Sequence, residues 1–211
     1  FDPALPNDLV VYLGPREARR LGLRSVMTGD GADELFAGYS YMQRLEGLEG
    51  YIRRLCRFMS FSSTPLGAHL GLRVHQPYLA REVVELALGL GRPWKVREEG
   101  GRVWGKWALR KAFEGLLPSE FIWQEKRPLE MGSGASTLRG VLAERISDEE
   151  FERARQDRPW LLCKEHLFFH ELYRREVGQV PPPGPGQERC PACGAGRDPG
   201  RRHCRVCGTM A

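Results

Sequence analysis

Residues 26–41 read VMTGDGADELFAGYSY. The stretch contains the turn Gly29-Asp30-Gly31, and glycines on both sides of an acid let the backbone adopt φ > 0 and approach a ligand without a Cβ in the way. A strand that ends in such a turn and leads into a helix is typical of the ligand-binding edge of an open α/β sheet. We therefore expect a buried, parallel strand over residues 23–28, followed by a functional loop.

Three carboxylates crowd this loop. Asp30, Asp33 and Glu34 lie close together in the sequence, and neighbouring carboxylates repel one another unless a cation such as Mg²⁺ or a lysine sits between them. The loop therefore favours a site that holds a cation. The alternative is a solvated acidic turn in which Asp33 is the N-cap of the following helix.

The whole stretch resembles the acidic loop of the asparagine synthetase family, whose members read Ser/Thr-Gly-Glu/Asp-Gly-x-Asp-Glu-Leu-Phe-x-Gly-Tyr. The resemblance continues in GLRVHQPYLA at residues 71–80, in GKWALRKAF at residues 105–113 and in WQEK at residues 123–126, and it covers roughly residues 1–140. It implies an α/β fold: the C-terminal part of an adenine-nucleotide alpha-hydrolase-like (Rossmann-like) domain with a parallel sheet, mostly helical in this chain.

The resemblance also implies an activity and the residues that carry it. In that family ATP adenylates the side-chain carboxylate of aspartate, pyrophosphate leaves, and ammonia displaces AMP. Thr28 and Gly29 would line the nucleotide site, Asp30 would help to take up the proton of ammonia, Asp33 would bind Mg²⁺ or the substrate amine, and Lys106 and Lys126 would neutralise the phosphates. A lysine on a helix or loop is more often solvated, but the surrounding motifs favour a phosphate role for both lysines.

Several departures from the family pattern limit what the resemblance implies. The family's pyrophosphate loop, Ser-Gly-Gly-x-Asp-Ser, and its glutaminase domain do not occur in this chain, which begins with Phe1 rather than Met. We therefore expect an N-terminally truncated chain that does not turn over alone. Arg73, His75 and Ala80 stand where the family has Glu, Arg and Asp, so the amino-acid substrate, aspartate or a similar one, is left open.

A second glycine pattern, at residues 100–106, reads GGRVWGK and fits half of a phosphate-binding loop. Trp107 replaces the Ser or Thr that would bind Mg²⁺, so we interpret the pattern as a loop that enters a helix. The other helices are expected over residues 7–21 (kinked at Gly14-Pro15), 39–61, 79–90, 104–117, 136–145 and 148–155, with a break at 60–67, an extended segment at 69–78 and a loop at 131–135.

The last part of the chain has a different composition. Residues 178–188 contain PPPGPG and predict an exposed, semi-stiff linker between a synthetase-like domain over residues 1–177 and a small module over residues 189–211. That module carries two Cys-x-x-Cys pairs, Cys190 with Cys193 and Cys204 with Cys207, each followed by glycine, which is typical of a zinc ribbon. Free or redox-active thiols are the alternative. We expect the linker to uncouple the ribbon from the helices.

The formal net charge of +5 and the pI near 9.0 favour anionic partners, either nucleotide phosphates or nucleic acid. Besides an ATP-dependent ligase served by a glutaminase domain or subunit, two other readings stay open. In the first, the chain is a non-catalytic or RNA-directed relative whose ribbon binds nucleic acid through its arginines. In the second, the ribbon docks a glutaminase or another protein partner. No apolar run approaches the length of a membrane span, and paired cysteines that bind metal indicate a reducing, cytoplasmic setting. The arginines around the cysteines are Arg189, Arg197, Arg201, Arg202 and Arg205.

Overall fold

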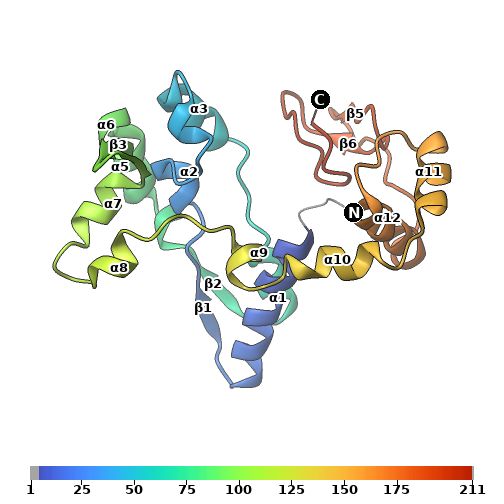
Figure 1. Cartoon of the computed structure of the whole chain (residues 1–211), viewed down its shortest axis with the longest axis horizontal. Coiled ribbons are helices and arrows are strands. Elements are labelled where there is room, and N and C mark those ends of the chain that lie inside the picture. Colours follow the sequence, from blue (N-terminus) through green and yellow to red (C-terminus); the bar gives the residue numbers. More distant parts are fainter. Residues whose placement is uncertain (1–4, 211) are drawn as a thin grey trace. The chain divides into compact units, whose positions relative to one another are not determined.

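The computed structural model describes residues 5–210, and the chain divides into two compact units (Figure 1). One unit is Val11–Arg127, and the other combines Pro128–Ala211 with the first ten residues. The fold is mixed α/β and mostly helical, with three small two-stranded sheets among the described residues. None of the described helices is both long and apolar enough to cross a membrane.

The strand expected before the acidic loop is present and is parallel to its neighbour. Strand β1 (Ser25–Met27) pairs with β2 (Arg73–His75), with Val26 opposite Val74. The expectation that this strand is buried is wrong, because Met27 is 74% exposed. A two-stranded sheet covers little of its own surface. Helix α4 (Ser63–His69) packs closely on β2, where a Cβ at Gly67 would lie 2.2 Å from a methyl group of Val74.

The helices of this unit are shorter than the sequence pattern predicts. The expected helix over residues 39–61 is interrupted, and Gly47 adopts φ +66° at the start of α3. The expected break at 60–67 contains the start of α4. These elements are α2 (Ala32–Phe36), the 3-10 turns η1 (Met42–Arg44) and η2 (Pro77–Leu79), α3 (Leu48–Leu55), α5 (Arg81–Gly89), α6 (Arg92–Lys95), α7 (Trp107–Ala112) and α8 (Ser119–Ile122).

A hairpin replaces the first part of the helix expected over residues 104–117. Strands β3 (Val96–Glu99) and β4 (Arg102–Gly105) are antiparallel, and Gly100 and Gly101 both adopt positive φ in the turn between them. Gly100 and Gly101, which fit half of a phosphate-binding loop in the sequence, therefore form a hairpin turn. Glycine adopts the positive φ of such a turn without strain.

Helix α1 (Leu5–Arg20) forms as expected and contains Pro15.

The core of the unit Val11–Arg127 lies beneath the acidic loop. Leu35 and Phe36 of α2 are buried against Met42, Leu48 and Ile52. Ala87 of α5 belongs to the same cluster. Since α2 begins directly after the acidic loop, the packing of its apolar face fixes where the carboxylates of that loop lie.

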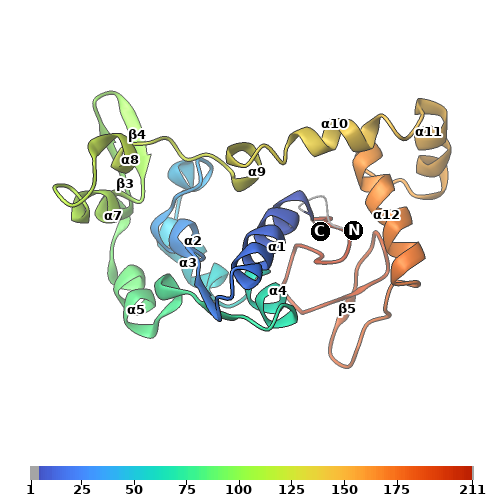
Figure 2. The same ribbon diagram turned by 90° about the horizontal axis from the view of Figure 1, so that it is seen from below.

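The other unit consists of helices followed by an extended C-terminal segment that contains β5 (Figure 2). Its longest helix, α12, was not among the helices expected from the sequence. Helix α9 overlaps the start of the loop expected at residues 131–135. Ile146, Ala154, Leu161 and Leu167 make a small core for α11 and α12. The elements are α9 (Leu129–Gly132), α10 (Thr137–Ala143), α11 (Asp148–Asp157), α12 (Lys164–Glu176), β5 (Glu188–Arg189) and β6 (Gly196–Arg197).

The cysteine segment packs on these helices. Cys190, Cys204 and Cys207 share one buried cluster with Leu142 of α10 and Phe169 of α12. The expectation that the proline-rich segment uncouples the ribbon from the helices is therefore wrong. The sequence pattern identified the linker but could not reveal that the chain folds back on α12.

Candidate functional site

Asp33 joins two lysines that are far from it in the sequence. Its Oδ1 lies 2.8 Å from Nζ of Lys106, and its Oδ2 lies 3.1 Å from Nζ of Lys126. The three side chains are partly buried, with 16% of Asp33, 25% of Lys106 and 32% of Lys126 exposed. Two lysine ammonium groups thus lie beside the acidic loop, and lysine was one of the two kinds of cation that the sequence allowed. Ion pairs that are partly removed from water are stronger than those on an open surface.

The backbone around Asp33 is arranged to bring Lys106 close. Lys106 and Ala37 both adopt φ +56°, and the amide of Lys106 donates to the carbonyl of Phe36 at 2.9 Å. Left-handed backbone at residues other than glycine costs energy and persists where the surrounding structure requires it. Gly38 leaves the space that the pair occupies, because a Cβ there would lie 1.8 Å from Oδ1 of Asp33 and 2.5 Å from Cε of Lys106.

Asp33 is not the N-cap of α2, as the alternative reading of the loop required. Gly31, with φ +89°, occupies the cap position, and Asp33 lies in the first turn. A carboxylate in the first helical turn still gains from the exposed amide groups there.

Lys126 has a second contact, with an aromatic ring. Its Nζ lies 5.6 Å from the ring centroid of Tyr39, and the Tyr39 hydroxyl donates to Glu34 at 2.7 Å. Burial, followed by the hydrogen bond to Glu34, raises the pKa of Tyr39 far above its usual range. The ring therefore stays neutral and offers Lys126 a π face. Glu34 thus orients the tyrosine. Among the described residues, the ion pairs of the two lysines are made with Asp33 and not with Glu34.

Asp30 lies at the carboxyl ends of the two parallel strands. Its Oδ2 accepts hydrogen bonds from the hydroxyl of Thr28 at 2.7 Å, from the amide of Gln76 at 2.9 Å and from the hydroxyl of Ser63. Gly29 has open space where a Cβ would be, so this part of the loop can be approached by a ligand.

Sequence reasoning missed Ser63 and Gln76 as partners of Asp30. Gln76 follows β2 directly, so its place at the same sheet edge as Asp30 was a readable signal. Ser63 is 2% exposed at the start of α4, a helix that the pattern did not predict, and no sequence signal marked it.

A cavity of about 350 Å³ opens beside the two lysines. Its lining combines apolar side chains with four cationic ones, so it suits an anion with an apolar part. The less polar lining residues are Ala32, Tyr78, Leu109, Phe113, Leu117, Phe121 and Ile122, and the polar and charged ones are Lys106, Arg110, Gln124, Glu125, Lys126 and Arg127.

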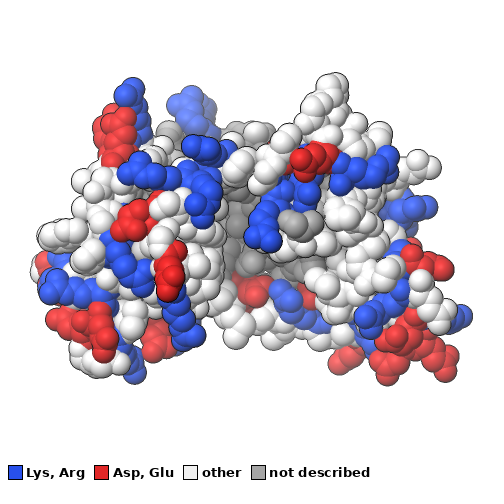
Figure 3. Space-filling model, turned by 90° about the horizontal axis from the view of Figure 1, so that it is seen from above, with Lys and Arg blue, Asp and Glu red and all other residues white. Residues whose placement is uncertain are grey.

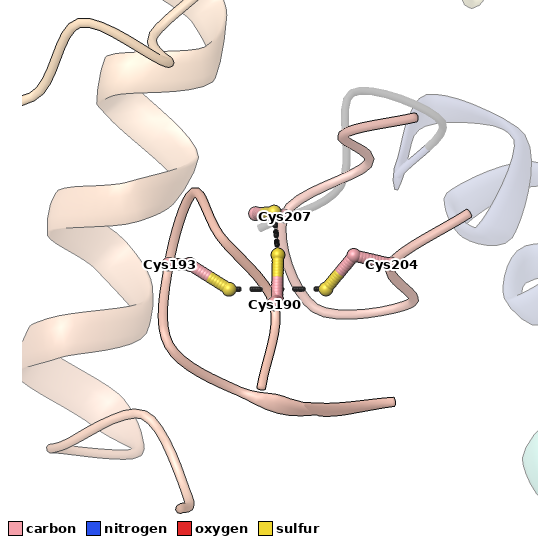
Figure 4. A group of neighbouring side chains, drawn as sticks. All are labelled: Cys190, Cys193, Cys204 and Cys207. Atoms are coloured by element: carbon pink, nitrogen blue, oxygen red, sulfur yellow. Dashed lines mark hydrogen bonds between the residues drawn. The ribbon is translucent and has the colours of Figure 1, made fainter. Parts of the chain in front are cut away.

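The four cysteines of the C-terminal pairs converge on one point (Figure 4). Their sulfur atoms all lie within 4.8 Å of one another, and the pairs Cys190–Cys207 and Cys193–Cys204 are each separated by 3.8 Å. That separation is far longer than a disulfide bond. It matches the edge of a tetrahedron with metal–sulfur bonds of about 2.3 Å, so the cluster fits Zn²⁺.

The turns that carry the cysteines are closed by backbone hydrogen bonds. The amides of Gly194 and Gly208 donate to the carbonyls of Cys190 and Cys204 at 2.9 and 2.8 Å, and both glycines adopt positive φ. Burial raises the pKa of the Cys193 and Cys207 thiols, whereas at Cys190 the amide hydrogen bonds from Cys193 and Ala192 and the neighbouring thiols outweigh burial and lower the pKa. A thiolate is the form that binds metal.

The arginines around the cysteines serve the local fold in part. Arg197 and Arg201 are only 12% and 16% exposed and lie 3.5 Å and 3.7 Å from Glu188 and Asp198. On the face of the molecule in Figure 3, basic and acidic side chains are intermixed. Arg197 and Arg201 thus take part in ion pairs of the local fold, and binding of nucleic acid by the ribbon stays a prediction.

Comparisons with known proteins agree with the resemblance of the motifs. The asparagine synthase family profile matches residues 4–67 and 65–179. The chain is 27% identical over 175 residues to asparagine synthetase B [glutamine-hydrolyzing] of Escherichia coli (strain K12), which covers 77% of this chain and 31% of that protein. It is 26% identical over 182 residues to the asparagine synthetase [glutamine-hydrolyzing] of Brassica oleracea, with 78% and 31% covered.

A relative from Triphysaria versicolor, also an asparagine synthetase [glutamine-hydrolyzing], is 30% identical over 145 residues, which cover 63% of this chain and 25% of that protein. The chain thus spans about a third or less of the length of the curated relatives it matches. The family match includes the acidic loop and both of its lysines, whereas the cysteine cluster lies beyond it. Because the match extends over most of its residues, the chain belongs to the asparagine synthase family.

Proposed function

We propose that the chain is the C-terminal part of an ATP-dependent amidoligase, which adenylates a carboxylate and then forms an amide with ammonia, releasing AMP and pyrophosphate. The observation that carries this proposal is the convergence of Lys106 and Lys126 on Asp33 next to an acidic loop at the end of a parallel strand. Such a loop is where nucleotides bind in open α/β sheets. The family membership supports the same reaction class.

The two lysines are suited to phosphate. Each ammonium group is a compact point charge, and Asp33 holds the two together on one carboxylate, which offsets their mutual repulsion. A triphosphate would compete with Asp33 for these ammonium groups and would then leave the carboxylate available. Bound Mg²⁺ would neutralise phosphate charge, and Asp33 and Asp30 are the residues of the loop whose oxygens suit it.

Asp30 is proposed to accept the proton of ammonia. Three donors already occupy its Oδ2, so Oδ1 is the oxygen left for a substrate. Thr28, Ser63 and Gln76 would hold this carboxylate in place while the amide forms. A fixed carboxylate within reach of the attacking amine is the arrangement that general-base catalysis requires.

The acyl substrate is an amino acid such as aspartate, and we leave its exact identity open. Ala80, at the start of α5, has no charge with which to bind a substrate amine. Ammonia would come from a glutaminase domain or subunit.

The proposed domain organisation is a synthetase-like region over residues 1–177, a linker over 178–188 and a zinc ribbon over 189–211, in a cytoplasmic protein.

Substitution of Lys126 tests the adenylation step. In the longest product that the gene encodes, Lys126→Ala should lower substrate-dependent exchange of labelled pyrophosphate into ATP by about a hundredfold, because loss of one charge-stabilising group from such a site costs on the order of 3 kcal/mol. Lys111→Ala is the matched control, since Lys111 is 43% exposed and its ammonium group contacts Glu114 and the Trp107 ring rather than Asp33. Exchange should be measured with each amino acid in turn. Full exchange by the Lys126 variant would exclude the phosphate role.

Substitution of Asp30 separates the two half-reactions when pyrophosphate exchange and amide formation are both measured. Asp30→Asn should retain pyrophosphate exchange and lose amide formation by about 10²- to 10⁴-fold, the usual contribution of a general base. If Asp30 instead holds Mg²⁺, both steps should fall together. A variant that retains full amide synthesis would exclude both roles.

A further inference from the structure

Arg110, on α7, connects the segments that carry the two lysines. Its Nε donates to the carbonyl of Gly105 at 2.9 Å, and its Nη1 donates to the carbonyl of Gln124 at 3.1 Å and to that of Ile122. Gly105 immediately precedes Lys106, and Gln124 lies two residues before Lys126. One guanidinium group therefore holds both lysine-bearing segments by their backbones.

Two tryptophans enclose this guanidinium group. Its carbon lies 5.0 Å from the ring centroid of Trp104 and 5.9 Å from that of Trp123, and the two rings are 5.3 Å apart at 73°. Trp104 belongs to β4, and Trp123 follows α8. The two ring faces stabilise the positive charge of Arg110 through cation–π contacts.

The environment of Arg110 suits arginine and not lysine. Burial lowers the pKa of Arg110, and the negative charge of Asp33 opposes this effect. The guanidinium group stays charged in proteins, and its planar fork reaches several carbonyl oxygens while it stacks on aromatic rings. A lysine here would keep the charge but lose the fork, so the two segments would no longer be held by one group.

We propose that Arg110 is a positioning residue that sets the distance between Lys106 and Lys126, and thereby shapes the site that receives the phosphates. This inference rests on the proposed function for its meaning in catalysis, but the geometry itself can be tested without nucleotide. Arg110 also lines the cavity beside the lysines, but its hydrogen bonds are directed to three backbone carbonyls, so the role we assign to it acts through the lysines.

The test is site-resolved acetylation of lysines in the whole chain with a limiting amount of an amine-acylating reagent, followed by peptide mass spectrometry. In Arg110→Lys, Lys126 should leave Asp33 and react on the order of tenfold faster, the factor expected from losing a charge-assisted hydrogen bond. Lys106 should accelerate as well, and Lys164, which pairs with Asp148 in the other unit, serves as the reference. Lys95 is 1% exposed and reports whether the unit stays folded.

Arg102→Lys is the matched control. Arg102 also reaches the lysine-bearing loop, through Glu125 at 3.1 Å, but both side chains are largely exposed, so the variant should leave the rates at Lys106 and Lys126 unchanged. The proposal is overturned if Lys126 reacts at the wild-type rate in Arg110→Lys. It is also overturned if Lys95 accelerates by the same factor as Lys126 in both Arg110→Lys and Arg110→Gln, because Arg110 would then only stabilise the unit as a whole.

This readout separates the inference from the proposed function. Faster acetylation of Lys126 in Arg110→Lys, together with full pyrophosphate exchange by Lys126→Ala, would leave Arg110 as the residue that places the lysines and would remove the phosphate role. Unchanged acetylation of Lys126 in Arg110→Lys, together with a loss of pyrophosphate exchange in Lys126→Ala, would keep the phosphate role of Lys126 and remove the positioning role of Arg110.

Discussion

The cysteine cluster and the Asp33 site are assembled in opposite ways. All four cysteines lie between residues 190 and 207, in two turns that repeat the same spacing. Asp33 meets a lysine from the start of α7 and another from the loop after α8. The cluster is thus made by local turns, and the Asp33 site is made by tertiary packing.

Because the two sites are assembled differently, different substitutions should disrupt them. The cysteine turns form their own hydrogen bonds, but their sulfur atoms are buried against Leu142 and Phe169, so the cluster is also part of the core of its unit. The Asp33 site depends on a close approach that Gly38 and the left-handed backbone of Lys106 permit. Loss of metal should therefore spread into the helices of the C-terminal unit, whereas a steric change at Gly38 should act on the acidic loop.

Loss of one cysteine should have the largest effect. Cys204→Ser should abolish stoichiometric zinc binding and disorder residues 189–210, because metal binding contributes on the order of 10 kcal/mol to such small modules. Since the cluster packs on α10 and α12, amide protection in α12 should fall as well. Metal analysis and hydrogen exchange measure the two effects.

The control for this substitution is Cys163→Ser in the same unit, where the side chain lies outside the cluster at the N-cap of α12. Serine is a good N-cap, so zinc content and exchange should stay as in the wild type. Unchanged protection of α12 in zinc-free Cys204→Ser would show that the ribbon is independent of the helices after all.

A methyl group at Gly38 should have the next largest effect. Gly38→Ala places a Cβ 1.8 Å from Oδ1 of Asp33, so it should destabilise the unit Val11–Arg127 by about 1–3 kcal/mol, the usual cost of overpacking. Gly50→Ala is the matched control, because its Cβ would meet only Arg54, at 3.6 Å, within α3. That variant should be stabilised by up to about 1 kcal/mol.

Urea unfolding followed by tryptophan fluorescence measures both changes, since most of the tryptophans lie in this unit. Equal stability of Gly38→Ala and the wild type would mean that Asp33 and Lys106 do not pack as closely as described.

The buried Lys95 should give the smallest effect, visible as a pH dependence. Burial lowers the pKa of Lys95, which Glu49 opposes and Arg53 reinforces. Between the folded pKa and the unfolded value of 10.5, the unfolded chain binds a proton that the folded chain does not, so stability rises with pH in this window. Relative to Lys95→Met, the wild type should therefore gain stability as the pH rises toward 10.5, by at most about 1.4 kcal/mol per pH unit.

The measurement is the free energy of unfolding at several pH values below 10.5, for the wild type and for Lys95→Met. Lys111→Met, which removes a partly exposed lysine, is the control, and its stability should depend on pH as that of the wild type does. If the stability of the wild type rose with pH no more than that of Lys95→Met, the amine of Lys95 would not be desolvated in the folded chain.

The sequence was sufficient for patterns that depend on near neighbours. The parallel strand before the acidic loop, helix α1 and the convergence of the four cysteines follow from short-range spacing, and the structure agrees with them. Helix lengths were less accurate, because Gly47, Gly100 and Gly101 turn the chain through left-handed backbone that a pattern of apolar residues does not reveal. Helix α12 was missed altogether.

The family motif, the acidic loop with its candidate lysines, and the paired spacing of Cys190, Cys193, Cys204 and Cys207 can all be recognised in the amino-acid sequence. The folded chain adds contacts that the sequence does not reveal: Asp33 pairs with both lysines, Ser63 and Gln76 donate to Asp30, and the cysteine turns pack on α10 and α12. The two groups of features differ in the sequence separation of the residues that meet. Spacing within a turn fixes which side chains meet locally, whereas contacts between distant segments depend on how their apolar faces pack, and no short pattern encodes that.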